Sequence, residues 1–525
     1  MSAIGVGALV LAGSARATHA SHATTQSNAS RYGGTLRFRA EGPPDCLDPA
    51  KSAGNISDLE TQAILDPLVM ETSKGQIVPD LATSWQYSNG GKVITFKLRH
   101  GVKFSNGHPF NAAAVKWSLE RVIDPKTASP NTGLIGPLKT VKVINAYTVR
   151  VIMKTVFRPL MVGLAGGYLA IMDPIAMKKE GKNTCQMIIG TGPFKIQSIG
   201  PAYNPITLVR NPYHTWETPF AVNRGKAYLD RIVFKPIVSD ETTVSSLLSG
   251  GLDLAKFSGP QLNRVQSNKK IKLFKLLVQG ENYMVYNSAH KPLNDPAVRR
   301  AIAEAIDRTA LIKAVVNGLG IPALTSIPST MKWYDKSAPS YAIKYNPTDA
   351  QKVLSAHHVT GPLTFLTGKT PTGAAEAELI QAELGQVGIK VKIVQNSDQF
   401  TSISEKGQFD LEAGLWTYTD PDILFDFFHS SQEANGGYNF TFVKGSTAKT
   451  LDKYIIAGRT TNNLAKAKAA YANAQRFMDQ QAIIDPLWTD ENIDGYSTKV
   501  HGLRNNFFSG GEPITPVWQD IWLTK

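Results

Sequence analysis

The 525-residue sequence has only two cysteines, Cys46 and Cys185, and neither belongs to a Cys-x-x-Cys pair or to a cluster of cysteine and histidine. Zinc sites need such clusters, so the sequence predicts no metal site. The adjacent His357 and His358 do not change this, because neighbouring residues on a helix point in different directions and cannot easily bind one ion. In an oxidising compartment the two cysteines would form one disulfide, and two buried thiols are the alternative.

Motifs of common enzymes and nucleotide-binding proteins are missing as well. There is no P-loop, no Gly-x-Ser-x-Gly and no His-Glu-x-x-His. The segment Gly190-Thr191-Gly192 precedes a strand-like run, whereas a phosphate site would need the N-terminus of a helix there. Asp420 and Asp422 are separated by one proline, which fits a loop better than the opposed carboxylates of a glycosidase. We therefore expect no enzyme activity and no cofactor, and a secreted hydrolase is the least favoured alternative.

No apolar run approaches the roughly 20 residues that a membrane-spanning helix needs. The sustained run near the start, residues 3–12, is followed by small residues and a polar tract that continues to Ser30. This pattern predicts a signal peptide and polar leader over residues 1–30, and therefore export. No Lys or Arg precedes the run, which leaves a truncated N-terminus open. The segment 11–14 resembles a lipoprotein box, but Ser14 stands where the lipid-accepting cysteine would be, so we expect no lipid anchor there.

Basic residues are in excess, with a formal net charge of +14, but they are distributed along the chain and form no Lys/Arg block. No nucleic-acid-binding signature accompanies them, so the sequence favours a solvated basic surface and no nucleic acid partner. The chain is too long for one compact core, and with 42% hydrophobic residues it is too apolar to be disordered. Two or more lobes are the expectation.

Periodic apolar residues indicate a mixed α/β chain. Helices are predicted to begin after the capping residues Asn111, Asp295 and Asp307, and residues 464–478 carry one apolar face of a longer helix. Residues 363–393 read as strand, helix and strand, which is a βαβ unit.

Several motifs then occur in an order typical of one family. They are Tyr32-Gly33-Gly34-Thr35-Leu36, Leu47-Asp48-Pro49, Val78–Trp85, Leu98–Gly107, Gly190–Phe194, Arg210–Tyr213, Val298–Ile302, and Trp416 with Asp420-Pro421-Asp422. Together they resemble the family 5 extracellular solute-binding proteins, the dipeptide-, oligopeptide- and nickel-binding subunits of ABC importers, over nearly everything from Tyr32 to Trp522.

The resemblance implies an α/β, two-lobed periplasmic-binding-protein fold of class II with mixed sheets. We expect lobe I at 31–282, including an inserted subdomain at about 78–190, lobe II at 283–487, and a C-terminal return to lobe I at 488–525. Hinge strands are expected at the two crossovers, near 283–287 and 484–488. Both cysteines then fall in lobe I segments near the cleft, and this predicts a disulfide between Cys46 and Cys185.

Ligand-binding residues are also inferred from the resemblance. They are Gly42, Pro43, Pro44, Asp45 and Cys46 in one lobe I loop, then Thr191, Lys369, Trp416, Tyr418, Thr419 and Asp420. In peptide-binding relatives an acidic residue three positions after the matching Trp holds the peptide α-amine, and here that position is Thr419. Asp420 is the preferred polar contact, while Trp416 and Tyr418 form either flat cleft walls or lobe packing.

The resemblance implies a receptor that catalyses nothing. It would act as a monomer, capture a small organic solute (peptide, oligosaccharide or opine-like) between its lobes, and deliver it to the permease and ATPase complex of an ABC importer. A peptide receptor and a nickel or metallophore receptor of the same family are the alternatives.

Because Thr419 replaces the acidic residue, the sequence predicts that ordinary di- and oligopeptides are not the best ligands. Titration with panels of peptides, oligosaccharides and opine-like conjugates, repeated with Asp420→Asn, tests this. Micromolar peptide binding that disappears in the variant would contradict it.

Overall fold

The computed structural model describes residues 31–52, 58–216, 218, 220–396, 404, 406–433, 437–504, 507–508 and 517–525. The predicted signal peptide and leader, including Ser14, lie outside this part of the chain. Among the described residues, none of the helices is both long and apolar enough to cross a bilayer.

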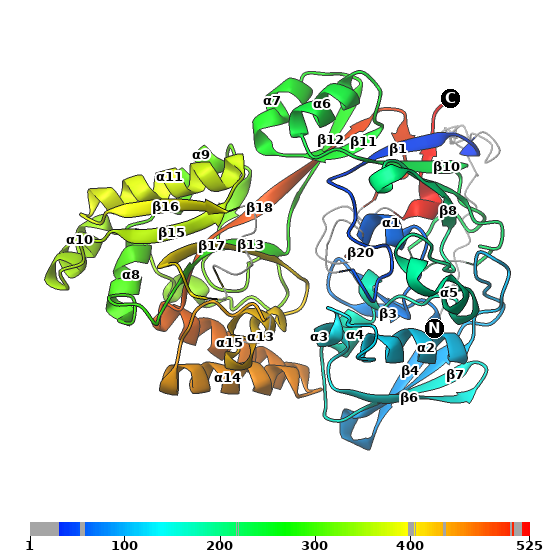
Figure 1. Ribbon diagram of the computed structural model, residues 1–525, viewed down its shortest axis with the longest axis horizontal. Helices are drawn as coiled ribbons and strands as arrows, with labels where there is room; N and C mark the ends of the chain where they lie inside the picture. Colours follow the sequence, from blue (N-terminus) through cyan, green and yellow to red (C-terminus); the bar gives the residue numbers. More distant parts are fainter. Residues whose placement is uncertain are drawn as a thin grey trace, which may run out of the picture.

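Two lobes lie side by side and are joined by a mixed sheet of 12 strands (Figure 1). This confirms the two-lobed α/β fold that the sequence predicts. The lobe I strands of this sheet are β1 (Thr35–Ala40), β8 (Phe194–Ile199), β9 (Ile206–Arg210), β10 (Arg231–Pro236), β11 (Leu254–Phe257) and β12 (Ile271–Leu277). The remaining strands are β13 (Gly280–Tyr286), β14 (Gly320–Pro322), β15 (Leu363–Gly368), β16 (Val391–Asn396), β17 (Leu411–Thr417) and β18 (Ile484–Ser497).

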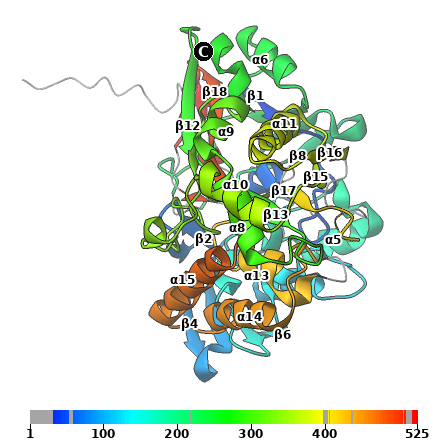
Figure 2. The same ribbon diagram turned by 90° about the vertical axis from the view of Figure 1, so that its left-hand side faces the viewer.

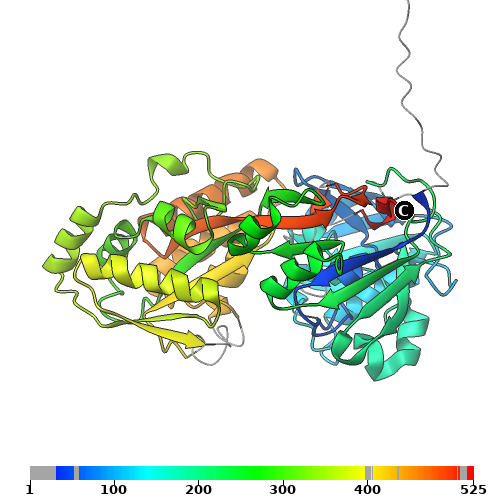
Figure 3. The same ribbon diagram turned by 90° about the horizontal axis from the view of Figure 1, so that it is seen from above.

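β18 connects the lobes. Its first half pairs with β13 and β14, and its second half pairs with β11 and β12. Figure 3 shows this strand passing from one lobe to the other. Residues 484–489 and 493–495 of the strand are buried, whereas Asp490, Glu491 and Asn492 between them are only half-buried, because they cross between two cores. The second crossing is the short turn at Val278 and Gln279, which joins β12 to β13.

An insertion in lobe I forms a separate antiparallel sheet with its own core. This sheet has the order β4 (Ala82–Ser88), β5 (Val93–Leu98), β7 (Thr148–Met153), β6 (Leu138–Asn145). Helix α2 (Ala112–Val122) packs on it and begins as predicted, because the Asn111 side chain accepts hydrogen bonds from the amides of Ala113 and Ala114. Asp48 of the Leu-Asp-Pro motif is buried and accepts a hydrogen bond from Arg121 of α2 at 2.7 Å, so this motif ties the insertion to lobe I.

Smaller elements complete lobe I. They are β2 (Val69–Thr72), β3 (Ile77–Pro79), β19 (Val500–His501), β20 (Phe507–Phe508), β21 (Trp522–Leu523), α1 (Asp58–Gln62), α3 (Thr132–Ile135), α4 (Leu160–Gly163), α5 (Pro174–Glu180), α6 (Asp240–Leu248) and α7 (Leu262–Val265). β19, β20 and β21 belong to the C-terminal segment, and they pair with each other or with β2 of lobe I.

Lobe II contains the predicted βαβ unit: β15 and β16 are parallel, and α11 (Pro371–Gln386) connects them. Its other helices are α8 (Pro296–Glu304), α9 (Arg308–Val315), α10 (Pro347–Ala356), α13 (Ile423–Phe428), α14 (Gly445–Arg459) and α15 (Leu464–Gln480). Figure 2 faces this lobe and shows α14 and α15 at its lower end. The α8 and α9 caps are Asp295 and Asp307, as predicted.

A disulfide joins Cys46 to Cys185, whose Cα atoms lie 4.4 Å apart. The amide of Leu47 also donates to the Cys185 carbonyl at 3.0 Å. The proline-rich loop is therefore tied to the segment that follows α5.

Replacing both cysteines by serine should lower the free energy of unfolding by roughly 2–5 kcal/mol, because the bond closes a loop with a sequence separation of 139. Thermal denaturation of the variant measures the loss, and peptide mapping without reductant checks the pairing. Two free thiols in the exported protein would contradict this assignment.

Candidate functional site

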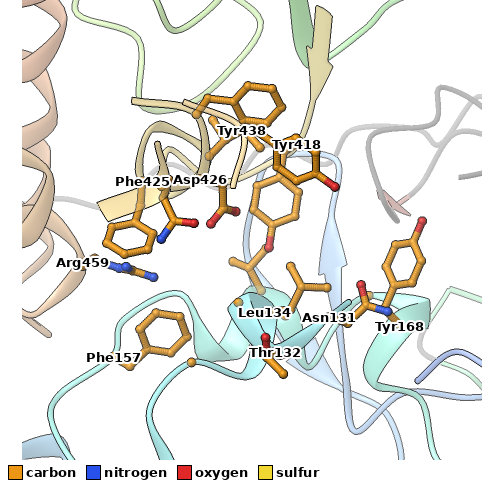
Figure 4. A pocket seen from close by; sticks show the side chains of 18 of the residues that line it. Asn131, Thr132, Leu134, Phe157, Tyr168, Tyr418, Phe425, Asp426, Tyr438 and Arg459 are labelled. Carbon is orange, nitrogen blue, oxygen red and sulfur yellow. The ribbon is translucent and has the colours of Figure 1, made fainter. Parts of the chain in front are cut away.

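A cavity of about 1120 Å³ lies between the lobes (Figure 4). Lobe I contributes α3, Phe157 and Tyr168, and lobe II contributes the end of β17, helix α13, Tyr438 and Arg459. A cavity of this volume can hold a small organic solute. Its walls come from segments that are far apart in the sequence.

Aromatic side chains cover much of the cavity wall. Those from lobe II are Trp416, Tyr418, Phe425, Phe427 and Tyr438, and those from lobe I are Phe157 and Tyr168. The rings of Phe427 and Tyr438 stack with their centroids 5.5 Å apart. Such walls suit a solute that presents flat or apolar surface, and stacked rings also attract cations.

Arg158 of lobe I reaches across to Asp420 of lobe II. Its two terminal nitrogens donate to both carboxylate oxygens at 2.7 and 2.6 Å, and the guanidinium lies 4.5 Å from the ring centroid of Trp333. Asp420 is fully buried, and 12% of the Arg158 side chain is exposed. Burial alone would lower the pKa of Arg158, but the attraction of Asp420 outweighs this and raises it. The pair acts as a charged latch between the lobes.

Glu71 of lobe I makes a second contact between the lobes. It accepts a hydrogen bond from the Thr419 hydroxyl at 2.7 Å, and Lys332 of lobe II lies 3.4 Å from its other oxygen. Burial raises the pKa of Glu71, while Lys332 and Thr419 counter this rise. The carboxylate at the cavity wall is therefore already paired.

Arg459 sits where the two lobes meet over the cavity. Its guanidinium pairs with Asp422 at 2.9 Å and lies 3.4 Å from the ring centroid of Phe425 and 5.1 Å from that of Phe157. Phe157 belongs to lobe I and Phe425 to lobe II, so the cation bridges the lobes (Figure 4). Burial raises the pKa of Asp422 to about 7, although Arg459 counters this.

Asp426 of α13 is the exception among these charged groups. Its carboxylate points into the cavity toward α3 and forms no hydrogen bond or ion pair with a described residue (Figure 4). A Cβ placed on Gly133 of α3 would lie 3.6 Å from its Oδ1 atom. Burial raises the pKa of Asp426 to about 6, and the charge of Arg459 acts in the opposite direction.

The structure brings together only part of the set inferred from the sequence. Trp416, Tyr418 and Thr419 line the cavity. Asp420 does not, because Arg158 and the amide of Asp422 occupy its oxygens. The contact of Asp420 with the solute stays a prediction, and because Asp420 is also a partner in the latch, a loss of binding in Asp420→Asn would report on this latch as well.

The other inferred residues lie away from the cavity wall. The carboxylate of Asp45 accepts hydrogen bonds from Ser52 and from the amide of Cys46, which keeps the loop from Gly42 through Pro43 and Pro44 folded on lobe I. Thr191 is fully buried and donates to Asp66 at 2.6 Å, because its segment packs against lobe I. Lys369 is exposed beyond the end of β15.

Sequence reasoning missed Arg158, Asp426, Arg459 and α3. Only Asp426 carried a local signal, as a charged residue within the aromatic segment 423–428. Among the described residues, no group of three or more His, Cys, Asp or Glu side chains could hold a metal ion. The arrangement can enclose an uncharged or cationic organic molecule.

Arg158→Ala should lower the free energy of unfolding of the closed form by about 3–5 kcal/mol, because it leaves Asp420 buried and unpaired. We expect a lower midpoint of thermal unfolding and a larger radius of gyration in small-angle scattering. The control is Arg264→Ala, which removes an exposed pair with Glu241 and should change little. Equal effects of the two substitutions would contradict the latch.

Comparison with known proteins agrees with this geometry. The chain is 26% identical over 474 residues to the glutathione-binding protein GsiB of Escherichia coli K12, covering 87% of this chain and 89% of that protein. The periplasmic binding protein DppA of Helicobacter pylori, solved with the peptide STSA, superposes with a TM-score of 0.80 at 25% identity, covering 95% and 99% of the two chains. AgaA of A. tumefaciens R10, solved with agropinic acid, superposes with a TM-score of 0.78 at 24% identity, covering 93% of this chain and 99% of that protein. This similarity shows a shared fold.

A family model described as bacterial extracellular solute-binding proteins, family 5 (middle part), matches residues 76–436. This is more than half of the chain, and it includes the insertion and most of the cavity wall. The chain belongs to family 5 of the bacterial extracellular solute-binding proteins, the receptors of ABC importers.

Proposed function

We propose that this receptor holds its solute in the cavity between the lobes and that the closed form docks on the membrane permease of an ABC importer. The observation that carries this proposal is the cavity itself, whose walls come from both lobes and whose rim is held by three charged contacts between them. A solute enclosed there contacts both lobes at once, so its binding energy favours closure. The leader over residues 1–30 would export the chain as a soluble monomer without a lipid anchor at Ser14.

Ordinary peptides fit this cavity less well than they fit peptide-binding relatives. A free peptide needs a carboxylate for its α-amine and a cation for its terminal carboxylate, since unpaired buried charges cost several kcal/mol. Thr419 offers no charge and Glu71 beside it is paired, so Asp426 is the described wall carboxylate left for an amine. The terminal carboxylate of a peptide, however, lacks a free partner. Arg459 is the cation at the wall, and Asp422 neutralises it. Relatives named for glutathione or solved with a peptide or agropinic acid show how widely solutes vary on this fold.

The proposed role includes no chemical step. Hydrolysis of a glycoside would need two free, opposed carboxyl groups. The adjacent Asp420 and Asp422 are each engaged by an arginine and serve lobe contacts instead. Capture and release are then governed by the shape of the cavity and by the charged rim.

Ligand binding should bring the lobes together, so the radius of gyration should fall when purified protein is saturated with the solute that co-purifies with it. Native mass spectrometry identifies that solute, and small-angle scattering follows closure. Gly133→Phe, which fills the cavity from α3, should abolish both the bound mass and the closure. Full retention of the solute by this variant would place binding elsewhere.

A further inference from the structure

We infer that Asp426 is the anchor for a cationic group of the solute and that the receptor prefers an organic cation, such as an amine or a quaternary ammonium, attached to a flat or apolar body. This inference rests on the proposed binding of solute in the cavity between the lobes. It concerns which group of the solute the cavity recognises.

The pairing of the neighbouring charges supports this assignment. Asp420 is held by Arg158, Asp422 by Arg459, and Glu71 by Lys332 and Thr419. Asp426 alone among the described cavity-wall carboxylates has no hydrogen-bonding partner, and it points into the cavity. Asp426 is half-buried, and a cationic group of the solute would give its carboxylate the partner that it lacks.

The surroundings of Asp426 suit an organic cation better than a metal ion. The wall beside it carries Tyr418, Phe425 and Phe427, whose rings attract cations and cover apolar surface. Within the described part of the chain, no group of three or more His, Cys, Asp or Glu side chains could hold a metal ion here. Opposite Asp426, α3 presents Thr132, Gly133 and Leu134, which carry no charge. A Cβ at position 133 would be in van der Waals contact with the carboxylate, so glycine keeps this side of Asp426 free of a side chain.

The charge balance of the wall also disfavours an anionic solute. Arg459 is the described cation of the wall, and its guanidinium is engaged by Asp422 and two aromatic rings. A carboxylate on the solute would therefore meet Asp426 and Glu71 without a free positive partner. A cationic group on the solute would instead meet Asp426, a carboxylate without a hydrogen-bonding partner among the described residues.

Binding of a cation should weaken on acidification. The pKa of Asp426 is raised to about 6, so the group is ionised at pH 7.5 and largely protonated at pH 5. The titratable groups that face it are Arg459 from α14, Asp422 on its own helix and Tyr418 after β17, and α3 adds none. Affinity for a cation should thus fall as the pH drops through about 6, whereas affinity for an uncharged analogue should not.

The experiment uses the full-length exported protein after exhaustive dialysis and compares 3-phenylpropylamine with its uncharged N-acetyl derivative by isothermal titration calorimetry. At pH 7.5 the amine should bind about 10- to 100-fold more tightly, the ratio expected for a charged hydrogen bond. Asp426→Asn should abolish this preference, and titration at pH 5 should reduce it about tenfold, because about a tenth of the carboxyl groups then remain ionised. Glu378→Gln, at an exposed carboxylate of α11, should keep it.

A preference for the amine that survives in Asp426→Asn, equal binding of the two probes, or no binding of either would overturn the inference. Because loss of a poorly solvated, unpaired charge is the only change, Asp426→Asn should unfold at the same or a higher temperature than the unaltered protein at pH 7.5. The receptor function is judged separately by the co-purifying solute and Gly133→Phe. A neutral or anionic solute that is lost only in Gly133→Phe would refute the anchor and leave the receptor intact.

Discussion

Backbone pairing along β18 is the constraint on which the geometry of the cavity depends. This strand pairs with β13 and β14 in lobe II and with β11 and β12 in lobe I, so two separately packed cores share one sheet. Residues Asp490 to Asn492, between its two buried stretches, are only half-buried. Because the described chain joins the two cores at this crossing and at the turn at Val278, relative motion of the lobes would have to bend the chain there.

Charge pairing then decides what those surfaces offer to a solute. Arg158 is inserted from lobe I into an acidic and aromatic pocket of lobe II, and Glu71 receives Lys332 and Thr419. These contacts link the lobes. Among the described carboxylates of the cavity wall they leave one without a hydrogen-bonding partner, Asp426, which lies among aromatic rings. The same arginines that hold the lobes together therefore remove Asp420 and Asp422 from solute recognition.

Local signals predicted the elements well where a single residue has a single physical role. Asn111, Asp295 and Asp307 cap helices because their side chains accept hydrogen bonds from the first free amides. The βαβ unit followed from apolar periodicity. The ion pair of Asp420 could not be predicted, because its motif reveals only that a carboxylate is present. Its partner, Arg158, lies 262 positions away in the chain and carries no local signal.

The sequence by itself determined the family, the two-lobed α/β architecture and the aromatic character of the segment after Trp416, because ordered motifs and periodic apolar residues act locally. Tertiary structure alone decided which charged side chains form ion pairs and which do not. Glu71 and Gly133 come to the cavity from lobe I, and Thr419 and Asp426 come from lobe II. Arg158 of lobe I and Asp420 of lobe II pair with each other instead of lining it. The availability of a carboxylate depends on what faces it across the lobes, and that juxtaposition exists only after both cores have folded around the shared strand.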